Sequence, residues 1–507
     1  MCALPRRHLI KVLLVAMLSA GCGTGESTPA SPDDATIASD DAAPEVDGDG
    51  GVLANASADG GRDATAAALD ATLGADGTVS ADARVTMDGS PGGSGVLGTG
   101  PLFVDPTRGS DSAAGTNGAP ECRMRTVTAA LSRIRSGGAP APRTIVVLGD
   151  VSYVTGERTW FVPADVQVIG AEASVGSSAF TPMQRRFSPA LPPSFGAPTA
   201  VAFGGARARL GYFIVDGQAG AGTVPPLSGI EILAAGDGMV LDHVVAQHFS
   251  NSAITIGIGG FPADYPANAL TRVTLTAVEA SDNGSDGLSV AASGRATILG
   301  GSGAPSIFSR NGHAGINIRG GGATIDGAAN GGFDVRALDN ARSGILATSP
   351  TRPGPTIDVR GFQARGHLTY GAGIELDGEV TLKLRRSEIV GNKIGVLAVS
   401  FNGAVGELSG LDLGTATDPG SNVLQATGAL ANQGPGLCIR SQNQAASTLT
   451  IVARGNRWLT TIGTMADCAS STATLARRAD CTVTGTPYAL GIEPKAAGAL
   501  VEVAGCQ

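Results

Sequence analysis

The chain has 507 residues, of which 75 are glycine and only 4% are aromatic, with 16% charged residues and a formal net charge of −9. The acidic balance excludes a basic nucleic-acid-binding protein, the low charged fraction excludes a coiled coil, and the length excludes a small disulfide scaffold. Abundant glycine with few aromatic residues favours a repetitive architecture over several independent globular domains.

The first residues are typical of a bacterial export signal. Arg6, Arg7 and Lys11 precede an apolar run over residues 12–20, and small residues follow up to Cys22. Basic residues before a short apolar run mark a segment that is removed after export. We therefore predict that residues 1–21 are a signal peptide cleaved directly before Cys22, and the alternative is an ordinary secretory signal to which Cys22 is incidental.

Residues 18–22, Leu-Ser-Ala-Gly-Cys, resemble the lipobox of bacterial lipoproteins, although Ser19 stands where that motif prefers Leu. The resemblance implies that Cys22 is acylated and anchors the mature chain to a membrane. Gly23 follows the cysteine, where an Asp is the usual signal for retention in the inner membrane. The resemblance therefore implies a lipid-anchored protein of the outer membrane.

Residues 22–100 form the next segment. Positions 23–100 carry fourteen Asp or Glu against two Arg, whereas residues 101–507 have no net charge. The segment is built mainly of Ala, Gly, Asp, Ser and Thr, and it lacks the branched and aromatic side chains needed to offset ordering entropy. We predict a disordered acidic tether that extends by self-repulsion.

The folded body is predicted to begin near Pro101 with a series of short motifs. In order, these are FVDP at 103–106, GSDS at 109–112, RTV at 125–127, TIVVLGD at 144–150 and VQVIG at 166–170. They resemble a domain-of-unknown-function family that opens many bacterial right-handed parallel β-helices of the pectin-lyase-like superfamily. That family usually has an aromatic residue after the proline that corresponds to Pro120. This chain has Glu121 and Cys122 there instead.

A short helix is predicted within this opening region. Apolar residues recur at i, i+3, i+4 and i+7, which is the spacing of one helix face, and Thr126 is available as the N-cap. The apolar face consists of Val127, Ala130, Leu131 and Ile134. We expect this helix to cover the open end of a stacked core, as a terminal repeat must.

Downstream, a Gly or Ala followed by a branched apolar residue recurs at steps of 22 to 41 residues. The pairs begin at Gly229, Ala253, Gly287, Gly315, Gly344, Gly373, Gly395 and Gly436. Steps of this size are typical of the coils of a β-solenoid. We predict an all-β, right-handed parallel β-helix of about ten to twelve coils over residues 101–460.

An asparagine precedes many of these pairs by three or four residues. Asn tolerates left-handed backbone and bonds to its own turn, so we expect it at the corners between strands, with stacked side chains forming ladders. The residues concerned are Asn283, Asn311, Asn340, Asn392 and Asn432. We assign them to structure.

The cysteines fall into two groups after removal of the signal. We expect disulfides among Cys438, Cys468, Cys481 and Cys506, because export places them in an oxidising compartment, but the sequence leaves three pairings open. Residues 461–507 are then predicted to form a C-terminal cap held together by disulfides.

Cys122 is interpreted as a buried free thiol, with a disulfide as the alternative. No Cys-x-x-Cys spacing is present, so we expect no zinc site.

Candidate catalytic residues are sparse. If the corners of successive coils stack, carboxylates and imidazoles could line one face and act as acid and base partners. The alternative is that they are exposed turn residues without chemistry. The candidates are Asp242 with His243 (and His248), Asp282 with Asp286, and Arg310 with His313, followed by His367 and Asp377.

These observations favour a non-catalytic, lipid-anchored envelope protein that presents a rigid surface to a carbohydrate or protein ligand. One alternative is a polysaccharide lyase or glycoside hydrolase, suggested by analogy of fold, and another is a purely structural surface rod. We expect no cofactor, calcium belonging only to the lyase alternative. The expected partners are the membrane, through the lipid anchor, and a surface ligand, with no nucleic acid and a monomeric chain.

Overall fold

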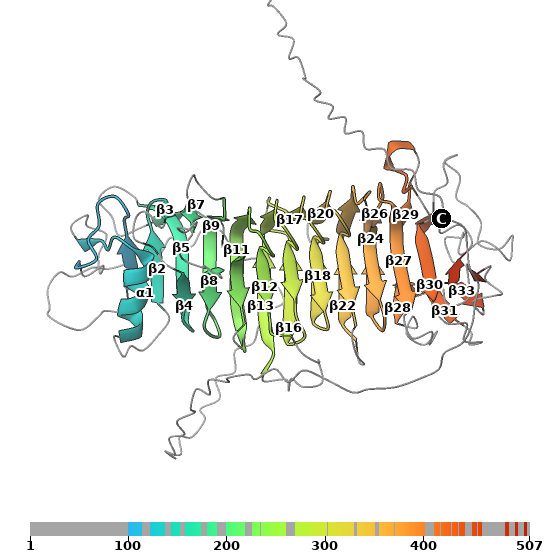
Figure 1. Ribbon diagram of the computed structural model, residues 1–507, viewed down its shortest axis with the longest axis horizontal. Helices are drawn as coiled ribbons and strands as arrows, with labels where there is room; N and C mark the ends of the chain where they lie inside the picture. The colour runs from blue at the N-terminus through green and yellow to red at the C-terminus, as the bar shows by residue number, and fades with distance from the viewer. Residues whose placement is uncertain are drawn as a thin grey trace, which may run out of the picture. The chain divides into compact units, whose positions relative to one another are not determined.

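The computed structural model describes most of residues 100–458, with short gaps, and three strands beyond them. In this part of the chain the strands wind into a parallel β-helix whose coils stack side by side (Figure 1). This confirms the predicted all-β, right-handed parallel β-helix class. The signal peptide, Cys22 and nearly all of the acidic tether lie outside the described residues.

Each coil contributes strands to three ladders, which we call ladders 1, 2 and 3. Ladder 1 contains β1 (Leu102–Val104), β2 (Arg143–Val147), β5 (Val166–Ala173), β9 (Arg209–Asp216), β11 (Gly236–Gln247), β13 (Thr271–Thr276), β16 (Gly294–Leu299), β19 (Gly322–Asp326), β22 (Thr356–Arg360), β25 (Thr381–Arg385), β28 (Leu411–Gly414) and β31 (Leu449–Ala453). Ladder 2 contains β3 (Val151–Ser152), β7 (Arg185–Ser188), the second halves of β9 and β11, β14 (Glu279–Ser281), β17 (Ser306–Ser309), β20 (Val335–Leu338), β23 (Phe362–Arg365), β26 (Glu388–Ile389), β29 (Val423–Gln425) and β32 (Arg457–Trp458).

Ladder 3 forms a separate sheet. Its parallel strands are β4 (Trp160–Val162), β8 (Thr199–Phe203), β10 (Ser228–Ile232), β12 (Ile254–Ile256), β15 (Leu288–Val290), β18 (Ile316–Arg319), β21 (Ile345–Thr348), β24 (Ala372–Asp377), β27 (Ile394–Ser400) and β30 (Leu437–Ser441). These ten strands, with the twelve of ladder 1, agree with the predicted number of coils.

The core lies inside the three ladders and is filled by small aliphatic side chains. In β13, for example, buried and half-buried residues alternate, so that Val273 and Leu275 point inward. Larger aromatic side chains gather in the first coils, where Trp160 stacks on Phe187 with ring centroids 4.1 Å apart and meets Phe213 edge-on at 5.3 Å. The later coils bury mainly aliphatic side chains, together with Phe308 and Phe362.

The predicted Gly–apolar pairs all lie at the beginning of ladder 3 strands. A Cβ on Gly315 would approach the carbonyl oxygen of Gly344 to 2.9 Å, and a Cβ on Gly344 would approach that of Gly373 to 2.5 Å. Because consecutive coils come this close, glycine is favoured where the chain enters ladder 3, and Ala253 is the exception among these pairs. The apolar residue that follows, such as Ile316, points into the core.

The predicted asparagine ladder lies at the corner between ladders 2 and 3. The side chain of Asn283 accepts the backbone N–H of Phe249 on the preceding coil. Each later side chain of the column accepts the backbone N–H of the column residue before it, in the order Asn311, Asn340, His367, Asn392 and Asn432. The expectation that Asn itself takes the left-handed conformation is wrong. The residue before it does, as at Asp282 (φ 59°) and Arg310 (φ 53°), because the Asn side chain must turn inward to stack.

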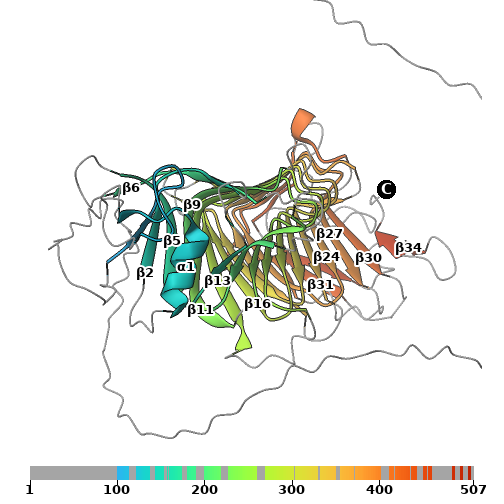
Figure 2. The same ribbon diagram turned by 60° about the vertical axis from the view of Figure 1, so that its left-hand side comes forward.

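Both ends of the β-helix carry additional elements. The helix α1 (Val127–Ser136) packs against the first coils through Val127, Ala130 and Leu131 (Figure 2). Thr126 is its N-cap, as predicted, because its Oγ1 accepts the N–H of Ala129 at 3.0 Å. At the other end, β33 (Thr482–Gly485) and β35 (Val501–Val503) pair antiparallel with β31 and β30 of the last coils, and β34 (Ile492–Pro494) pairs antiparallel with β35.

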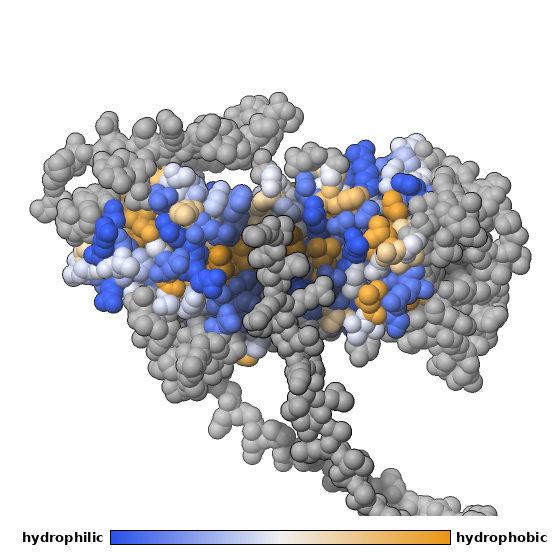
Figure 3. Space-filling model, turned by 90° about the horizontal axis from the view of Figure 1, so that it is seen from above, coloured by the Kyte–Doolittle hydropathy of each residue, from blue (hydrophilic) through white to orange (hydrophobic). Residues whose placement is uncertain are grey.

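The remaining described elements are short. The strand β6 (Phe180–Pro182) forms a hairpin with the end of β5, and a single 3-10 turn, η6 (Gly428–Leu430), precedes β30. The surface seen in Figure 3 is a mosaic of hydrophilic and hydrophobic side chains. The exposed large apolar residues in the described part of the chain include Leu227, Leu233 and Ile258.

Candidate functional site

The first predicted pair, Asp242 with His243, lies at the corner between ladders 1 and 2. Asp242 accepts a hydrogen bond from His243 Nδ1 at 2.7 Å and is ion-paired with Arg209. His243 has a left-handed backbone, and its ring stacks on Tyr212 of the preceding coil at 4.7 Å. These contacts satisfy the pair within the corner itself, and the pair lies away from the other candidates.

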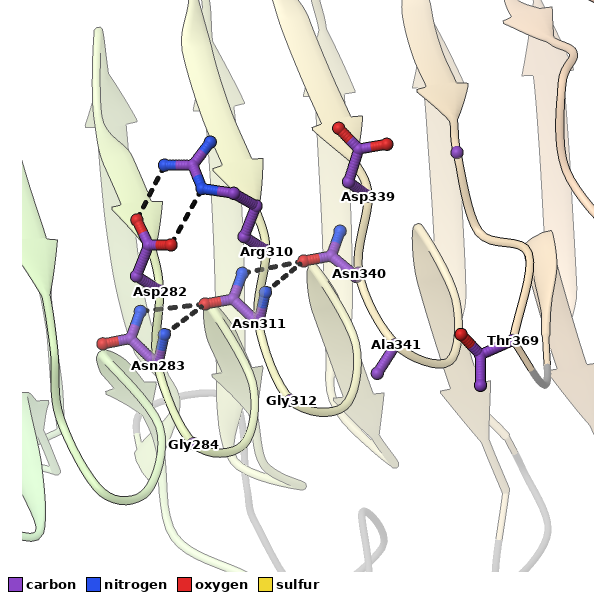
Figure 4. Close-up of a pocket in the computed structure, with 11 residues that line it drawn as sticks. Asp282, Asn283, Gly284, Arg310, Asn311, Gly312, Asp339, Asn340, Ala341 and Thr369 are labelled. Carbon is purple, nitrogen blue, oxygen red and sulfur yellow. Dashed lines mark hydrogen bonds and ion pairs between the residues drawn. The ribbon is translucent and has the colours of Figure 1, made fainter. Parts of the chain in front are cut away.

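Asp282 and Arg310 occupy the left-handed positions of the corner between ladders 2 and 3. The guanidinium of Arg310 donates two hydrogen bonds to the carboxylate of Asp282, at 2.8 and 2.7 Å. This ion pair holds the pKa of Asp282 below its usual range. The two residues line a shallow depression of about 570 Å³ along the outside of the asparagine column (Figure 4).

The expected grouping of Asp282 with Asp286, and of Arg310 with His313, is therefore wrong. The chain turns the corner between these residues, so Asp282 and Arg310 point outward beside ladder 2, whereas Asp286 and His313 reach the outer face of ladder 3. Two neighbouring carboxylates in the sequence thus serve different surfaces. The second surface carries the polar cluster that we consider as the candidate site.

Asp286 is the buried centre of the first half of that cluster. Its side chain is 1% exposed and accepts hydrogen bonds from His313 Nδ1 at 2.6 Å and from Asn317 Nδ2 at 2.9 Å. Arg319 approaches the same carboxylate at 3.6 Å. The residues come from the turns before β15 and β18 and from the outward positions of β18.

The second half of the cluster is built around Arg342. Its Nε and one terminal nitrogen donate to both oxygens of Glu375, at 3.0 and 2.7 Å, and Ser343 donates to Glu375 at 2.6 Å. The same terminal nitrogen lies 3.5 Å from Asp377. Arg342 precedes β21, whereas Glu375 and Asp377 point outward from β24, so the cluster spans consecutive coils.

His313 joins the two halves. Its Nε2 lies 3.3 Å from Arg342, and because Arg342 has only donors, Nε2 must accept this hydrogen bond. The proton of the neutral ring is then on Nδ1, where it is donated to Asp286. The six residues Asp286, His313, Asn317, Arg342, Glu375 and Asp377 form one connected network, which we call the ladder 3 cluster.

Burial makes the electrostatics of this cluster unusual. Desolvation raises the pKa of Asp377 to about 6, with repulsion from Glu375 adding to the effect and Arg342 opposing it. The pKa of Arg342 is raised by its hydrogen bonds to Glu375. Asp377 is therefore a carboxyl group that changes charge near neutral pH, which is common at functional sites.

One polar atom of the cluster has no partner. Asn317 is 0% exposed, and its Oδ1 atom accepts no hydrogen bond from the described residues. A buried amide oxygen without a donor costs free energy, so such an atom points to a ligand or water that completes it.

Asn317, Arg342 and Glu375 were not among the predicted site residues, whereas Asp286, His313 and Asp377 were. The signal that locates them is the register of the Gly–apolar pairs. Asn317 and Glu375 each follow such a pair directly, at Ile316 and Ile374, and the register places both in one outward row.

His367 is not part of this cluster, because it lies fully buried in the asparagine column. His248 lies at the corner between ladders 2 and 3, where its Nδ1 is hydrogen-bonded to Asp216 at 2.8 Å.

Cys438 is buried on β30 and is disulfide-bonded, whereas Cys468, Cys481 and Cys506 lie outside the described residues, so the pairing stays a prediction. Cys122 is a free thiol, as interpreted, but is only half-buried.

In the described part of the chain, no three side chains of His, Cys, Asp or Glu are placed to hold a metal ion. Within the same residues, no helix has the length and apolar character to span a membrane.

Comparisons with known proteins concern the fold. No protein-family model matches the chain, and no curated protein matches its sequence. Among solved structures, the A-module of a mannuronan C-5 epimerase from Azotobacter vinelandii is 13% identical in sequence, with a TM-score of 0.40. The match covers 70% of this chain and 86% of the epimerase chain. A pectate lyase is 15% identical in sequence, with a TM-score of 0.37, and the match covers 76% of this chain and 87% of the lyase chain. The parallel β-helix class rests on the strand pairing of ladders 1, 2 and 3.

Proposed function

We propose that this chain is a lipid-anchored protein of the cell envelope whose β-helix binds a glycan on the outer face of ladder 3. The observation that carries the proposal is the convergence of the ladder 3 cluster on consecutive coils. Donors and acceptors held rigidly on strands, with one acceptor left unpartnered, are what a polar ligand rich in hydroxyl groups requires.

The repeat of the fold also suits a linear polymer. Strands of consecutive coils are about 4.8 Å apart, so a glycan lying across the strands meets an equivalent set of outward positions at each coil. The cluster extends from the turn before β15 to β24, a span of about 14 Å over four coils. Such a row of equivalent positions is long enough to contact more than one sugar residue of a linear polymer.

Binding is tested by titrating a panel of neutral, acidic and amino-containing oligosaccharides into the purified protein by calorimetry. We expect at least one class to bind, and the variant Arg342→Gln to lose affinity because it breaks the link between Glu375 and His313. The matched control is Arg360→Gln on ladder 1, which leaves binding unchanged. Absence of binding to the whole panel would contradict the proposal.

The anchor and location are a separate part of the proposal. They are supported by the lipobox-like residues 18–22 and by the acidic composition of residues 22–100. Metabolic labelling with a fatty acid, followed by membrane fractionation, should show label on the wild-type chain in the outer membrane. Cys22→Ala should abolish the label and release the protein, and a labelled Cys22→Ala chain would contradict the assignment.

A second candidate function is cleavage of the bound glycan by acid–base catalysis. It is favoured by the raised pKa of Asp377, which keeps a fraction of this carboxyl protonated near pH 6, and by the imidazole of His313 in the same network. New reducing or unsaturated chain ends that disappear in Asp377→Asn would support catalysis. Binding without new ends would favour the non-catalytic function.

A further inference from the structure

The ladder 3 cluster has an excess of acceptors at Asp377. The guanidinium of Arg342 directs its two shortest bonds, 2.7 and 3.0 Å, to Glu375. Among the described residues, Asp377 receives only one contact, at 3.5 Å from Arg342, although it is 7% exposed. One cation is thus shared unequally between two neighbouring carboxylates. Asp377 is left with little compensation for its burial.

Asn317 supplies a second, independent acceptor. Its Nδ2 donates to Asp286 at 2.9 Å, and because a carboxylate accepts hydrogen bonds only, this bond fixes the orientation of the amide. The unpartnered atom is therefore the carbonyl oxygen Oδ1, not the amino group. The ligand that completes this site must bring a hydrogen-bond donor.

The register of ladder 3 sets the distance between these acceptors. Asn317, Leu346 and Glu375 lie opposite one another on β18, β21 and β24, and the next outward row consists of Arg319, Thr348 and Asp377. Asn317 and Glu375 are therefore two coils, about 10 Å, apart. The apolar side chain of Leu346 lies between them in the row. A ligand with polar groups at two points about this far apart matches the spacing of the two acceptors.

The charge at Asp377 and Glu375 selects among glycans. A uronate would bring a carboxylate against two carboxylates, whose nearest cation is already bonded to Glu375. A neutral sugar would supply hydroxyl donors but leave the charge of Asp377 uncompensated. A protonated amine supplies both the donor and the positive charge, and it forms the stronger, charge-assisted hydrogen bond.

We propose that the ladder 3 cluster recognises a glycan containing amino sugars with a free ammonium group, which is held by Asp377 while a neighbouring donor is accepted by Asn317 Oδ1. This inference rests on the proposed glycan-binding function and names its ligand class. The raised pKa of Asp377 agrees with it, since an ammonium would offset the desolvation that raises that pKa.

The test compares two ligands that differ only at the amine. β-1,4-linked glucosamine oligomers and their N-acetylated counterparts of equal length are titrated into the purified protein at pH 7, with oligogalacturonate and an oligolysine peptide alongside. We expect the glucosamine oligomer to bind at least about tenfold more tightly than the acetylated form, and its affinity to fall as salt is raised.

Variants locate the effect. Asp377→Asn should remove the preference for the amine, whereas Asp358→Asn, the same change on the outward face of ladder 1, should keep it. Asn317→Leu should weaken both sugar ligands, since it removes the acceptor without changing charge. A preference that survives in Asp377→Asn would overturn the assignment to this cluster.

The outcomes separate the two proposals. Equal binding of the amino and acetylated oligomers, or tighter binding of oligogalacturonate, would overturn the ligand class and leave glycan binding intact. Binding of the peptide with no binding of any sugar would overturn both and indicate a protein ligand. No binding of any of the four would also overturn both.

Discussion

His367 takes the place of an asparagine in the buried column, and its Nδ1 accepts the backbone N–H of Asn340 at 3.1 Å. Its Nε2 lies 3.2 Å from the carbonyl oxygen of Ala337 and therefore carries the proton. The ring is thus held as one neutral tautomer. Protonation of Nδ1 would place two donors against each other at a site that is 0% exposed.

This contact predicts a sensitivity to acid. Burial lowers the pKa of His367 from 6.5 to about 4, so between these values the unfolded chain binds more protons than the folded chain. The stabilising contribution is present above pH 6.5 and is lost as the pH falls through about 4, with a limit of about 3 kcal/mol. Denaturant unfolding at pH 7.5 and 4.5 should show a smaller loss for His367→Asn than for the wild type. Equal losses in the two proteins would contradict this explanation.

The asparagine column should contribute measurably to stability. The Oδ1 of Asn311 accepts the Nδ2–H of Asn283 at 2.9 Å, and its own Nδ2 donates to Asn340 at 2.9 Å. Asn311→Ala leaves buried partners unsatisfied and is expected to lower the free energy of unfolding by about 2–4 kcal/mol. The exposed Asn251 is the matched control, and Asn251→Ala should cost less than about 0.5 kcal/mol. Similar costs for the two variants would show that stacking of the column is not stabilising.

A buried carboxylate joins the capping helix to the first coils. Glu157 accepts the N–H groups of Val127 and Thr128, at 2.6 and 3.0 Å, and the indole N–H of Trp160 at 3.0 Å. Glu157→Ala should destabilise the fold by about 2–4 kcal/mol, because these three donors and the hydroxyl of Thr128 lose their acceptor. Glu157→Gln retains one acceptor oxygen and should cost less. Thermal unfolding followed by Trp160 fluorescence measures both, and an unchanged midpoint for Glu157→Ala would contradict this role.

Asp377 should be unfavourable for stability when it is ionised. Its pKa is raised from 3.8 to about 6, so the stabilising contribution is present below pH 3.8 and is lost as the pH rises through about 6. Asp377→Asn is therefore expected to raise the free energy of unfolding at pH 8, by up to about 3 kcal/mol, and to change it little near pH 4. Denaturant titrations at the two pH values check this. A destabilised variant at pH 8 would mean that Arg342 fully compensates the charge.

The sequence predicts the fold well because its repeat has a direct steric cause. Close approach of consecutive coils requires glycine at positions such as Gly315 and Gly344, and the inward residue that follows must be apolar. The pairs therefore mark each ladder 3 strand, despite insertions in the turns that vary the spacing. The asparagine column is visible in the sequence for a similar reason, although His367 shows that another acceptor is able to replace Asn.

The candidate site was only partly predictable, because a corner of the backbone separates neighbouring residues. Asp282 and Asp286 are four positions apart, yet one is paired with Arg310 outside the asparagine column and the other is buried beneath the face of ladder 3. Conversely, Asn317 and Glu375 are far apart in the sequence and share one outward row. Only the register of the strands reveals this difference.

The most direct test of the account is to map where a glycan contacts the purified protein, by hydrogen exchange with the oligosaccharide panel present and absent. The account predicts slower exchange in peptides covering 313–319, 342–348 and 372–377, and no change in the ladder 1 strands of the same coils. Protection confined to ladder 1, to the depression beside Asp282 and Arg310, or to no part of the β-helix would contradict it.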